Sequence, residues 1–222
     1  MPGIKGPDAL IPGSQHPGRR QIKASGPLIR RLLCGGEICY SSGMSTNSME
    51  SKQALSHLSC LGSASTIVDE LFEALGHSNF FDDFTRDDIS NLSRFMEIYR
   101  AEPGQIIIKE GNTDDFMLFV LEGLINIVKT DANGDRRSMT YVGPGATLGE
   151  MSMIDGEPRF ATCIAIDATL FSVFSRDSMV RIILEQPALG AKILIKLVTL
   201  LSQRLRETSS SLLRHLERSD AV

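Results

Sequence analysis

Apolar and polar positions follow a helical period in two short segments before residue 96. From residue 66 the apolar residues recur every three or four positions, which predicts a helix that ends at Gly76. The repeating positions are Ile67, Leu71, Phe72 and Leu75. Thr85 can cap a second, shorter helix, because Asp87 and Asp88 follow it in the first turn. Between the two helices, Phe80 and Phe81 are candidate core residues.

The period changes between residues 96 and 174, where short runs rich in β-branched and aromatic residues alternate with turn residues. Pro103-Gly104 is typical of a type II turn and Asn133-Gly134 of a hairpin. Strands at this spacing predict an antiparallel sandwich or barrel. The predicted strands cover residues 96–99, 105–109, 116–121, 124–128, 137–142, 161–166 and 169–174.

The last part of the chain returns to a helical period. Ser175 can cap one helix and Pro187 can begin the next. In that last helix, mainly apolar residues recur at alternating spacings of three and four, which is the pattern of a heptad seam. A helix of about thirty residues spans about 45 Å. The seam favours a parallel pairing with a second copy, and packing of the seam on the chain's own barrel is the alternative. The seam consists of Ala191, Leu194, Val198, Leu201, Leu205, Thr208 and Leu212.

The N-terminal residues lack such a pattern. Residues 1–43 contain five of the nine prolines and eight of the nineteen glycines, so they bury too little apolar surface to offset their ordering entropy. We therefore expect a disordered or poorly ordered extension over residues 1–60. A brief amphipathic turn at residues 28–33, on a membrane or a partner, and a start of translation at Met44 or Met49 are the alternatives.

Charge and composition narrow the classes of function. Residues 1–48 carry six Lys and Arg against two Asp and Glu, a net charge of +4, so a whole-chain charge of −4 leaves −8 for residues 49–222. An acidic body is not typical of a DNA-binding domain. No apolar run approaches the ~20 residues that span a bilayer, and the N-terminus lacks the layout of a secretory signal.

Outside residues 149–162, which are described below, the sequence contains no recognisable catalytic or metal-binding motif. The cysteines and histidines show no metal-ligand spacing, and reduced thiols in a cytoplasmic protein are the favoured interpretation. No nucleophile elbow and no glycine-rich lysine loop for phosphate is present, so we expect no enzyme. The residues concerned are Cys34, Cys39, Cys60, Cys163, His16, His57, His77 and His215.

Residues 149–162 combine a short helix signal, one acid, one arginine and a tight turn. Gly149 and Glu150 open a run of about one helical turn, whose free backbone N–H groups can face an anion. Residues 156–158 end that turn and return Arg159 toward the same N–H groups, where its donors suit phosphate oxygens. The Glu150 carboxylate is suited to accept a hydrogen bond from a ribose 2′-hydroxyl. The stretch therefore predicts a phosphorylated ribose held from both ends.

This stretch closely resembles the phosphate-binding cassette of cyclic-nucleotide-binding domains, in which Gly-Glu is followed about eight residues later by Arg, two small residues and Thr or Ser. The resemblance implies that Glu150 accepts from the ribose 2′-hydroxyl and that Arg159 pairs with the cyclic phosphate. Phe160 departs from the pattern, because the family usually carries Ala, Ser or Thr there. Its backbone N–H can still face the phosphate. The candidate ligand residues of the cassette are Gly149, Glu150, Met151, Arg159, Phe160 and Ala161.

The resemblance covers the chain from about residue 79 to its end and includes residues 103–106, 109–111 and 119–123. It implies a mainly β fold with flanking helices, a double-stranded β-helix or jelly-roll that the cassette interrupts. The domains expected are this jelly-roll with its N-terminal helices over residues 66–186 and a long dimerisation helix over residues 187–217.

The last helix also resembles the dimer helix of bacterial catabolite activator proteins. Arg204-Leu205-Arg206-Glu207-Thr208-Ser209 is similar to a segment whose Thr and Ser reach the adenine. The resemblance makes Thr208 and Ser209 candidate base contacts, one from each subunit of a dimer. The alternative is that these residues and the serines after them merely weaken the helix. Only thirteen residues follow Ser209, so we expect no helix-turn-helix domain and no direct DNA binding.

Together these features predict a cytoplasmic, homodimeric sensor that binds a cyclic nucleotide, cyclic AMP rather than cyclic GMP, and acts on a protein partner through its last helix. Two alternatives stay open. One is a transcription regulator of the catabolite activator family that lacks its DNA-binding half. The other is a structural module in which Phe160 fills the cavity and no nucleotide binds.

Overall fold

The computed structural model describes residue 28, residues 53–76 and residues 78–219. The strands are β1 (Ser59–Ser63), β2 (Glu97–Ala101), β3 (Ile106–Ile108), β4 (Phe116–Glu122), β5 (Ile125–Thr130), β6 (Arg136–Val142), β7 (Thr147–Leu148), β8 (Thr162–Ala165) and β9 (Thr169–Ser175). The helices are η1 (Ala64–Thr66), α3 (Val68–Leu75), α4 (Arg86–Ser93), α5 (Glu150–Asp155), α6 (Arg176–Glu185) and α7 (Pro187–Ser219).

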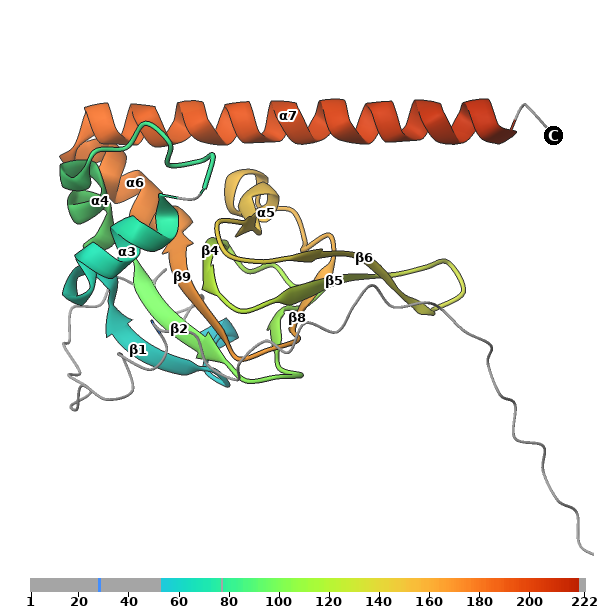
Figure 1. Cartoon of the computed structure of the whole chain (residues 1–222), viewed down its shortest axis with the longest axis horizontal. Helices are drawn as coiled ribbons and strands as arrows, with labels where there is room; N and C mark the ends of the chain where they lie inside the picture. Colours follow the sequence, from blue (N-terminus) through green and yellow to red (C-terminus); the bar gives the residue numbers. More distant parts are fainter. Residues whose placement is uncertain (1–27, 29–52, 77, 220–222) are drawn as a thin grey trace, which may run out of the picture.

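The strands form two antiparallel sheets that pack as the layers of a jelly-roll (Figure 1). One sheet has the order β1-β2-β9-β4-β7 and the other β3-β8-β5-β6. The cassette lies late in this order, since α5 connects β7 of the first sheet to β8 of the second. The predicted fold, mainly β with flanking helices and a long C-terminal helix, is confirmed.

Both faces of β4 are buried, and residues of the helices help to cover one of them. Its alternate residues Phe116, Leu118 and Val120 are buried in the core between the two sheets. The residues between them point to the other face of the sheet. That face is buried in a second core, which includes residues of the helices. Met117, Phe119 and Leu121 share that second core with Phe80 and Phe81, so the predicted role of these two phenylalanines is confirmed.

The local signals around the helices are present as predicted. Thr85 and Asp88 form a reciprocal capping box, with Thr85 Oγ1 accepting from the Asp88 N–H at 3.1 Å and the Asp88 carboxylate accepting from the Thr85 N–H at 2.9 Å. Ser175 caps α6 by accepting from the Ser178 N–H. Pro187 is the first residue of α7.

The folded part begins earlier than the sequence pattern indicates. The boundary placed at residue 60 falls inside β1, which pairs with β2, and Leu55 and Leu58 just before it are buried. This short strand has no helical or alternating period, and its partner lies more than thirty residues away, so local pattern could not reveal it. Most of the proposed N-terminal extension, including Met44 and Met49, lies outside the described residues. Leu28 is described, and its N–H donates to Glu122 Oε1 at 2.6 Å.

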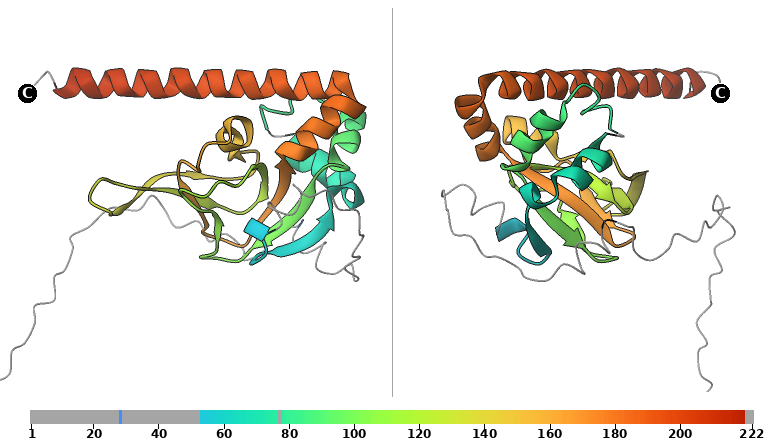
Figure 2. Two further views of the ribbon diagram at one scale, coloured as in Figure 1. Left: turned by 180° about the vertical axis from the view of Figure 1, so that it is seen from behind. Right: turned by 60° about the vertical axis from the view of Figure 1, so that its left-hand side comes forward.

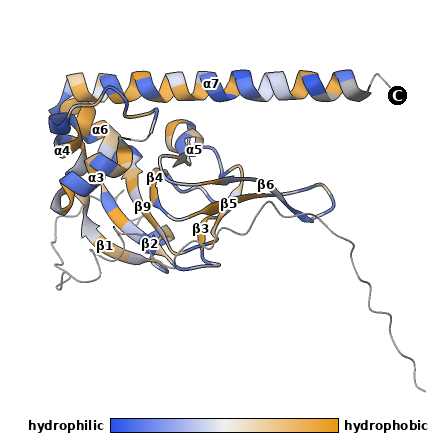
Figure 3. Ribbon diagram, viewed as in Figure 1, coloured by the Kyte–Doolittle hydropathy of each residue, from blue (hydrophilic) through white to orange (hydrophobic). Residues whose placement is uncertain are grey.

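The long helix α7 has two different faces. One face packs on the rest of the domain through Leu189, Ile193 and Leu197, all at least nine-tenths buried. Of the seven seam residues, six are exposed and Leu201 is half-buried, with Leu205 68% exposed. Packing of the seam on the chain's own barrel is therefore contradicted. α7 extends past the body of the domain (Figure 2), and apolar residues recur along its length (Figure 3).

Lys192 and Lys196 fix the first part of α7 to the domain. Lys192 pairs with Asp88 at 2.9 Å, and Lys196 pairs with Asp83 at 3.1 Å.

Within the described residues, no helix is both long and apolar enough to cross a membrane.

Candidate functional site

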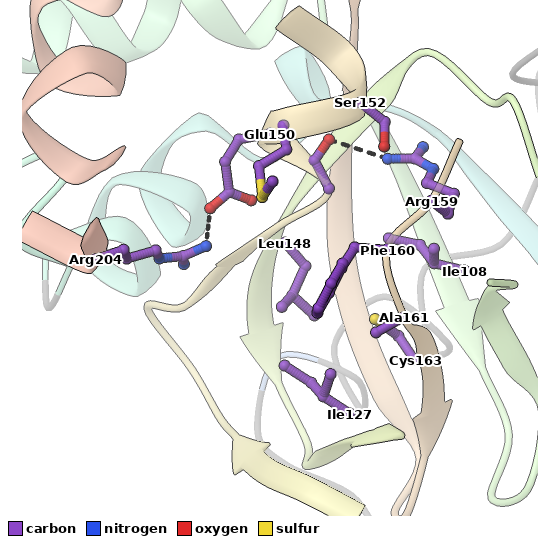
Figure 4. A pocket seen from close by; sticks show the side chains of 12 residues that line it. Ile108, Ile127, Leu148, Glu150, Ser152, Arg159, Phe160, Ala161, Cys163 and Arg204 are labelled. Atoms are coloured by element: carbon purple, nitrogen blue, oxygen red, sulfur yellow. Dashed lines mark hydrogen bonds and ion pairs between the residues drawn. The ribbon is translucent and has the colours of Figure 1, made fainter. Parts of the chain in front are cut away.

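The cassette folds into a compact turn of helix between two sheets. Gly149 leaves β7 with a φ of +82°, and six residues of α5 follow. Gly156 ends α5 in the left-handed conformation, and the chain returns through Pro158 to the first residues of β8. This path places Glu150 and Arg159 around one pocket (Figure 4). The pocket is lined by Ile108, Ile127, Leu148, Gly149, Glu150, Met151, Ser152, Arg159, Phe160, Ala161, Cys163 and Arg204.

Arg159 is a buried cation with incomplete hydrogen bonding. It is only 3% exposed, and its guanidinium carbon lies 4.4 Å from the centroid of the Phe116 ring. Nη1 donates to the Gly149 carbonyl at 3.0 Å, and Nε lies 3.8 Å from Asp114 Oδ2. Burial lowers the pKa of this guanidinium from its ordinary value, and the charge of Asp114 opposes that change.

Two donor atoms of Arg159 have no hydrogen-bond partner in the described part of the chain. These atoms are Nε and Nη2, and both are buried. A buried donor without an acceptor costs about 1–3 kcal/mol, and more for a charged group. The pocket wall therefore contains a cation with unused donors, which is the requirement for binding an anion.

Both the positive φ of Gly149 and the close approach of neighbouring atoms disfavour any residue with a side chain at this position. A Cβ at this position would lie 2.5 Å from Arg159 Nη1 and 2.9 Å from the Phe116 carbonyl oxygen. A glycine here lets the chain pass close to β4, and its carbonyl accepts the hydrogen bond from Arg159 Nη1.

Glu150 is buried at the opposite side of the pocket and is paired with a residue from α7. It is 1% exposed. Arg204 Nη1 donates to Glu150 Oε1, and Nη2 donates to the Thr147 carbonyl at 2.8 Å and to Thr147 Oγ1 at 3.1 Å. The acid of the cassette is thus connected directly to the long helix (Figure 4).

The sequence analysis did not predict the role of Arg204. It singled out the segment that contains this arginine but assigned the site to Thr208 and Ser209. The helical spacing could have revealed it, because Arg204 lies on the same face of α7 as Ile193, Leu197 and Leu200, which pack on the domain.

Thr208 and Ser209 are not brought to the pocket within this chain. Both are exposed, and the Thr208 hydroxyl donates to the carbonyl of Arg204 in its own helix at 2.8 Å. Their assignment as base contacts stays a prediction that needs a second subunit.

Met151, Phe160 and Ala161, which the sequence analysis named as candidate ligand residues, line the pocket, and their contact with a ligand stays a prediction. Phe160 is 56% exposed and Met151 53%, so both lie at its open side. Lys129 lies 4.3 Å from the centroid of the Phe160 ring, and its ammonium donates to the Phe160 carbonyl at 2.6 Å.

Thiol and metal chemistry contribute little to this site. Cys163 lines the pocket, but burial raises the pKa of its thiol to about 12, so it stays protonated and unreactive. Cys60 and Cys163 are both free. Over the described residues, no three His, Cys, Asp or Glu side chains gather as a metal site would require.

Comparison with known proteins assigns the fold and its cassette to a family. The profile of the cyclic nucleotide-binding domain matches residues 99–186. The crystal structure of a cyclic nucleotide-binding domain from Methylobacillus flagellatus is 35% identical, with a TM-score of 0.67, and the match covers 77% of this chain and 96% of that one. The chain belongs to the cyclic nucleotide-binding domain family.

Curated relatives are longer regulators. The cyclic AMP receptor protein of Thermus thermophilus is 28% identical over 49% of this chain and 49% of its own length. A CRP-like cAMP-activated global transcriptional regulator of Mycobacterium tuberculosis is 24% identical over 63% of this chain and 61% of its own. The chain thus matches between about half and three fifths of these relatives.

A pair of glycine substitutions tests the packing of the cassette. Gly149 and Gly134 both have a positive φ, but a Cβ at Gly134 meets nothing within 4 Å. Gly134→Ala should lower the free energy of unfolding by about 1–2 kcal/mol, the usual penalty of the left-handed conformation. Gly149→Ala should lower it further, because the new methyl group clashes with the Phe116 carbonyl. Urea unfolding of both variants measures the difference, and equal losses would contradict the close packing described for Gly149.

Proposed function

We propose that this chain is a non-enzymatic cytoplasmic sensor that binds cyclic AMP between Glu150 and Arg159. The observation that carries the proposal is that Arg159 is buried and that its Nε and Nη2 have no hydrogen-bond partner in the described part of the chain. A cyclic phosphodiester has one negative charge shared by two exocyclic oxygens, which matches two donors of one guanidinium. On the other side, the Glu150 carboxylate would accept from the ribose 2′-hydroxyl.

The choice of cyclic AMP rests on the relatives. The names of the Thermus and mycobacterial regulators associate those proteins with cyclic AMP. The alternative of a module without ligand is less well supported, because Phe160 is more than half exposed instead of buried within the cavity.

Arg204 supplies a physical link from ligand to output. A ribose hydroxyl at Glu150 would share the carboxylate that Arg204 contacts now, so binding would change the balance of contacts that holds α7. A ligand shifts such an equilibrium only as far as it binds one arrangement more tightly than the other. We propose that the shifted helix is read by a protein partner.

The exposed seam of α7 is proposed to pair with a second copy of the chain. Val198, Leu205 and Leu212 are each more than half exposed at heptad spacing. A soluble protein seldom leaves such a continuous apolar stripe in water. In this arrangement the partner's helix would bring a second Thr208 and Ser209 near the site.

Calorimetric titration of cyclic AMP and cyclic GMP tests the proposed ligand. Arg159→Ala should weaken cyclic AMP binding by at least about 30-fold, since loss of a buried charged partner costs about 2 kcal/mol or more. Arg137→Ala is the matched control, because this arginine is exposed in an ion pair with Asp131 and should leave binding unchanged. Equal affinity of wild type and Arg159→Ala would refute the role of Arg159, and no binding to wild type would refute the function.

Sedimentation velocity tests the proposed dimer. Leu205→Glu places a charge in the seam and should convert the dimer to monomers. Ser210→Glu adds the same charge to the same helix on the side away from the seam, and it should leave the dimer intact. A wild-type chain that sediments as a monomer at concentrations of about 100 μM would contradict the pairing.

A further inference from the structure

Phe160 occupies a distinctive place in the pocket. It is the one aromatic residue among the described residues that line it, and it directly follows Arg159 in the chain. Its ring lies amid the lining side chains of Leu148, Ile127 and Ala161 (Figure 4). With 56% of its surface exposed, the ring borders the opening instead of filling the interior.

The size of the pocket restricts where a base can lie. The cavity holds about 110 Å³, whereas sites that enclose a drug-sized ligand hold roughly 300–1,000 Å³. With a phosphate at Arg159 and the 2′-hydroxyl at Glu150, the ribose and its cyclic phosphate account for the enclosed part. The base, attached to the adjacent C1′ atom, must then extend toward the open side, where Phe160 lies.

Lys129 contacts both the ring and the backbone of Phe160. The Lys129 ammonium lies over one face of the ring and also donates to the Phe160 carbonyl. The same ammonium pairs with Glu110 Oε1 at 2.7 Å. Glu110 Oε2 in turn accepts from the Thr130 N–H at 3.0 Å and from its hydroxyl at 2.9 Å. A ring restrained by such a contact loses less entropy when a ligand stacks on it than a free ring would.

We propose that Phe160 is the base-stacking residue of this site and that the ring face opposite Lys129 receives a purine. The inference rests on the proposed function and adds the group that contacts the base. Stacking on an aromatic side chain contributes about 1–3 kcal/mol per base and accepts every base, because each has a π-face. Phe160 therefore strengthens binding of cyclic AMP and cyclic GMP alike and does not select between them.

The other candidate base contacts, Thr208 and Ser209, do not reach the pocket within one chain. Thr208 and Ser209 are exposed and do not line the pocket of their own chain. Phe160 provides a contact to the base from within one chain, before a second subunit contributes.

Titration with ligands that carry or lack a base tests the proposal. The ligands are cyclic AMP, cyclic GMP and the 1-O-methyl ribose 3′,5′-cyclic phosphate, which has no base. Phe160→Leu keeps an apolar side chain of similar size but removes the π-face. It should weaken binding of both nucleotides by about 5- to 150-fold and change the affinity for the baseless ligand by less than about twofold. Tyr141→Leu is the matched control, because Tyr141 is also 56% exposed and lies outside the pocket lining.

The possible results separate this inference from the proposed function. Unchanged or tighter nucleotide binding by Phe160→Leu would overturn the stacking role and indicate that the ring obstructs the pocket. An equal loss for all three ligands would also overturn it, since the ring would then serve only to position the phosphate site. A wild-type chain that binds none of them would overturn the proposed function and the stacking role together.

A spectroscopic measurement gives an independent readout. Stacking on Phe160 should shift the adenine H2 and H8 resonances of bound cyclic AMP upfield through the ring current. The shift should disappear in Phe160→Leu under saturating ligand. The same resonance positions in wild type and variant would count against stacking, whatever the affinities.

Discussion

A buried guanidinium is the constraint on which the cassette depends. Removing a charged group from water is costly unless its donors find acceptors. Arg159 obtains part of that compensation from the Gly149 carbonyl, the face of Phe116 and the more distant Asp114. Its backbone is fixed on both sides, since its N–H donates to the Asn112 carbonyl at 2.7 Å and its carbonyl accepts from the Gly111 N–H at 2.9 Å. Two of its side-chain donors, Nε and Nη2, have no hydrogen-bond partner among the described residues.

The pocket is lined by residues of the jelly-roll and by one residue of α7, Arg204. The first part of α7 is fixed by buried leucines and by the lysine pairs at Asp83 and Asp88. Arg204 lies where this anchored part ends, and the exposed seam continues beyond it. Glu150 therefore contacts a helix that is packed on the domain at one end and exposed at the other. In the proposed function, this arrangement would connect a ribose bound at Glu150 to the exposed part of α7.

Local chemistry was enough to predict most of the fold and the first part of the site. The capping box at Thr85, the turns around Gly104 and Gly134, and the cassette between Gly149 and Thr162 each depend on residues close in sequence. β1 was missed because its identity comes from pairing with a distant strand. Arg204 was missed for the same reason, since its partners Glu150 and Thr147 lie more than fifty residues away. The contacts of Phe160 likewise come from a distant part of the chain, since Lys129 lies on β5, 31 residues earlier.

The direct test of the central claim is a measurement on Arg159 itself. Arginine Nε–Hε resonances in a ¹H–¹⁵N spectrum report whether each guanidinium gains an acceptor, and Arg159→Lys identifies the Arg159 signal by its loss. Saturation with cyclic AMP should move the Arg159 signal downfield, because Nε acquires a phosphate oxygen, while the signal of the exposed Arg137 stays in place. An Arg159 signal that does not change as cyclic AMP saturates the protein would contradict the account.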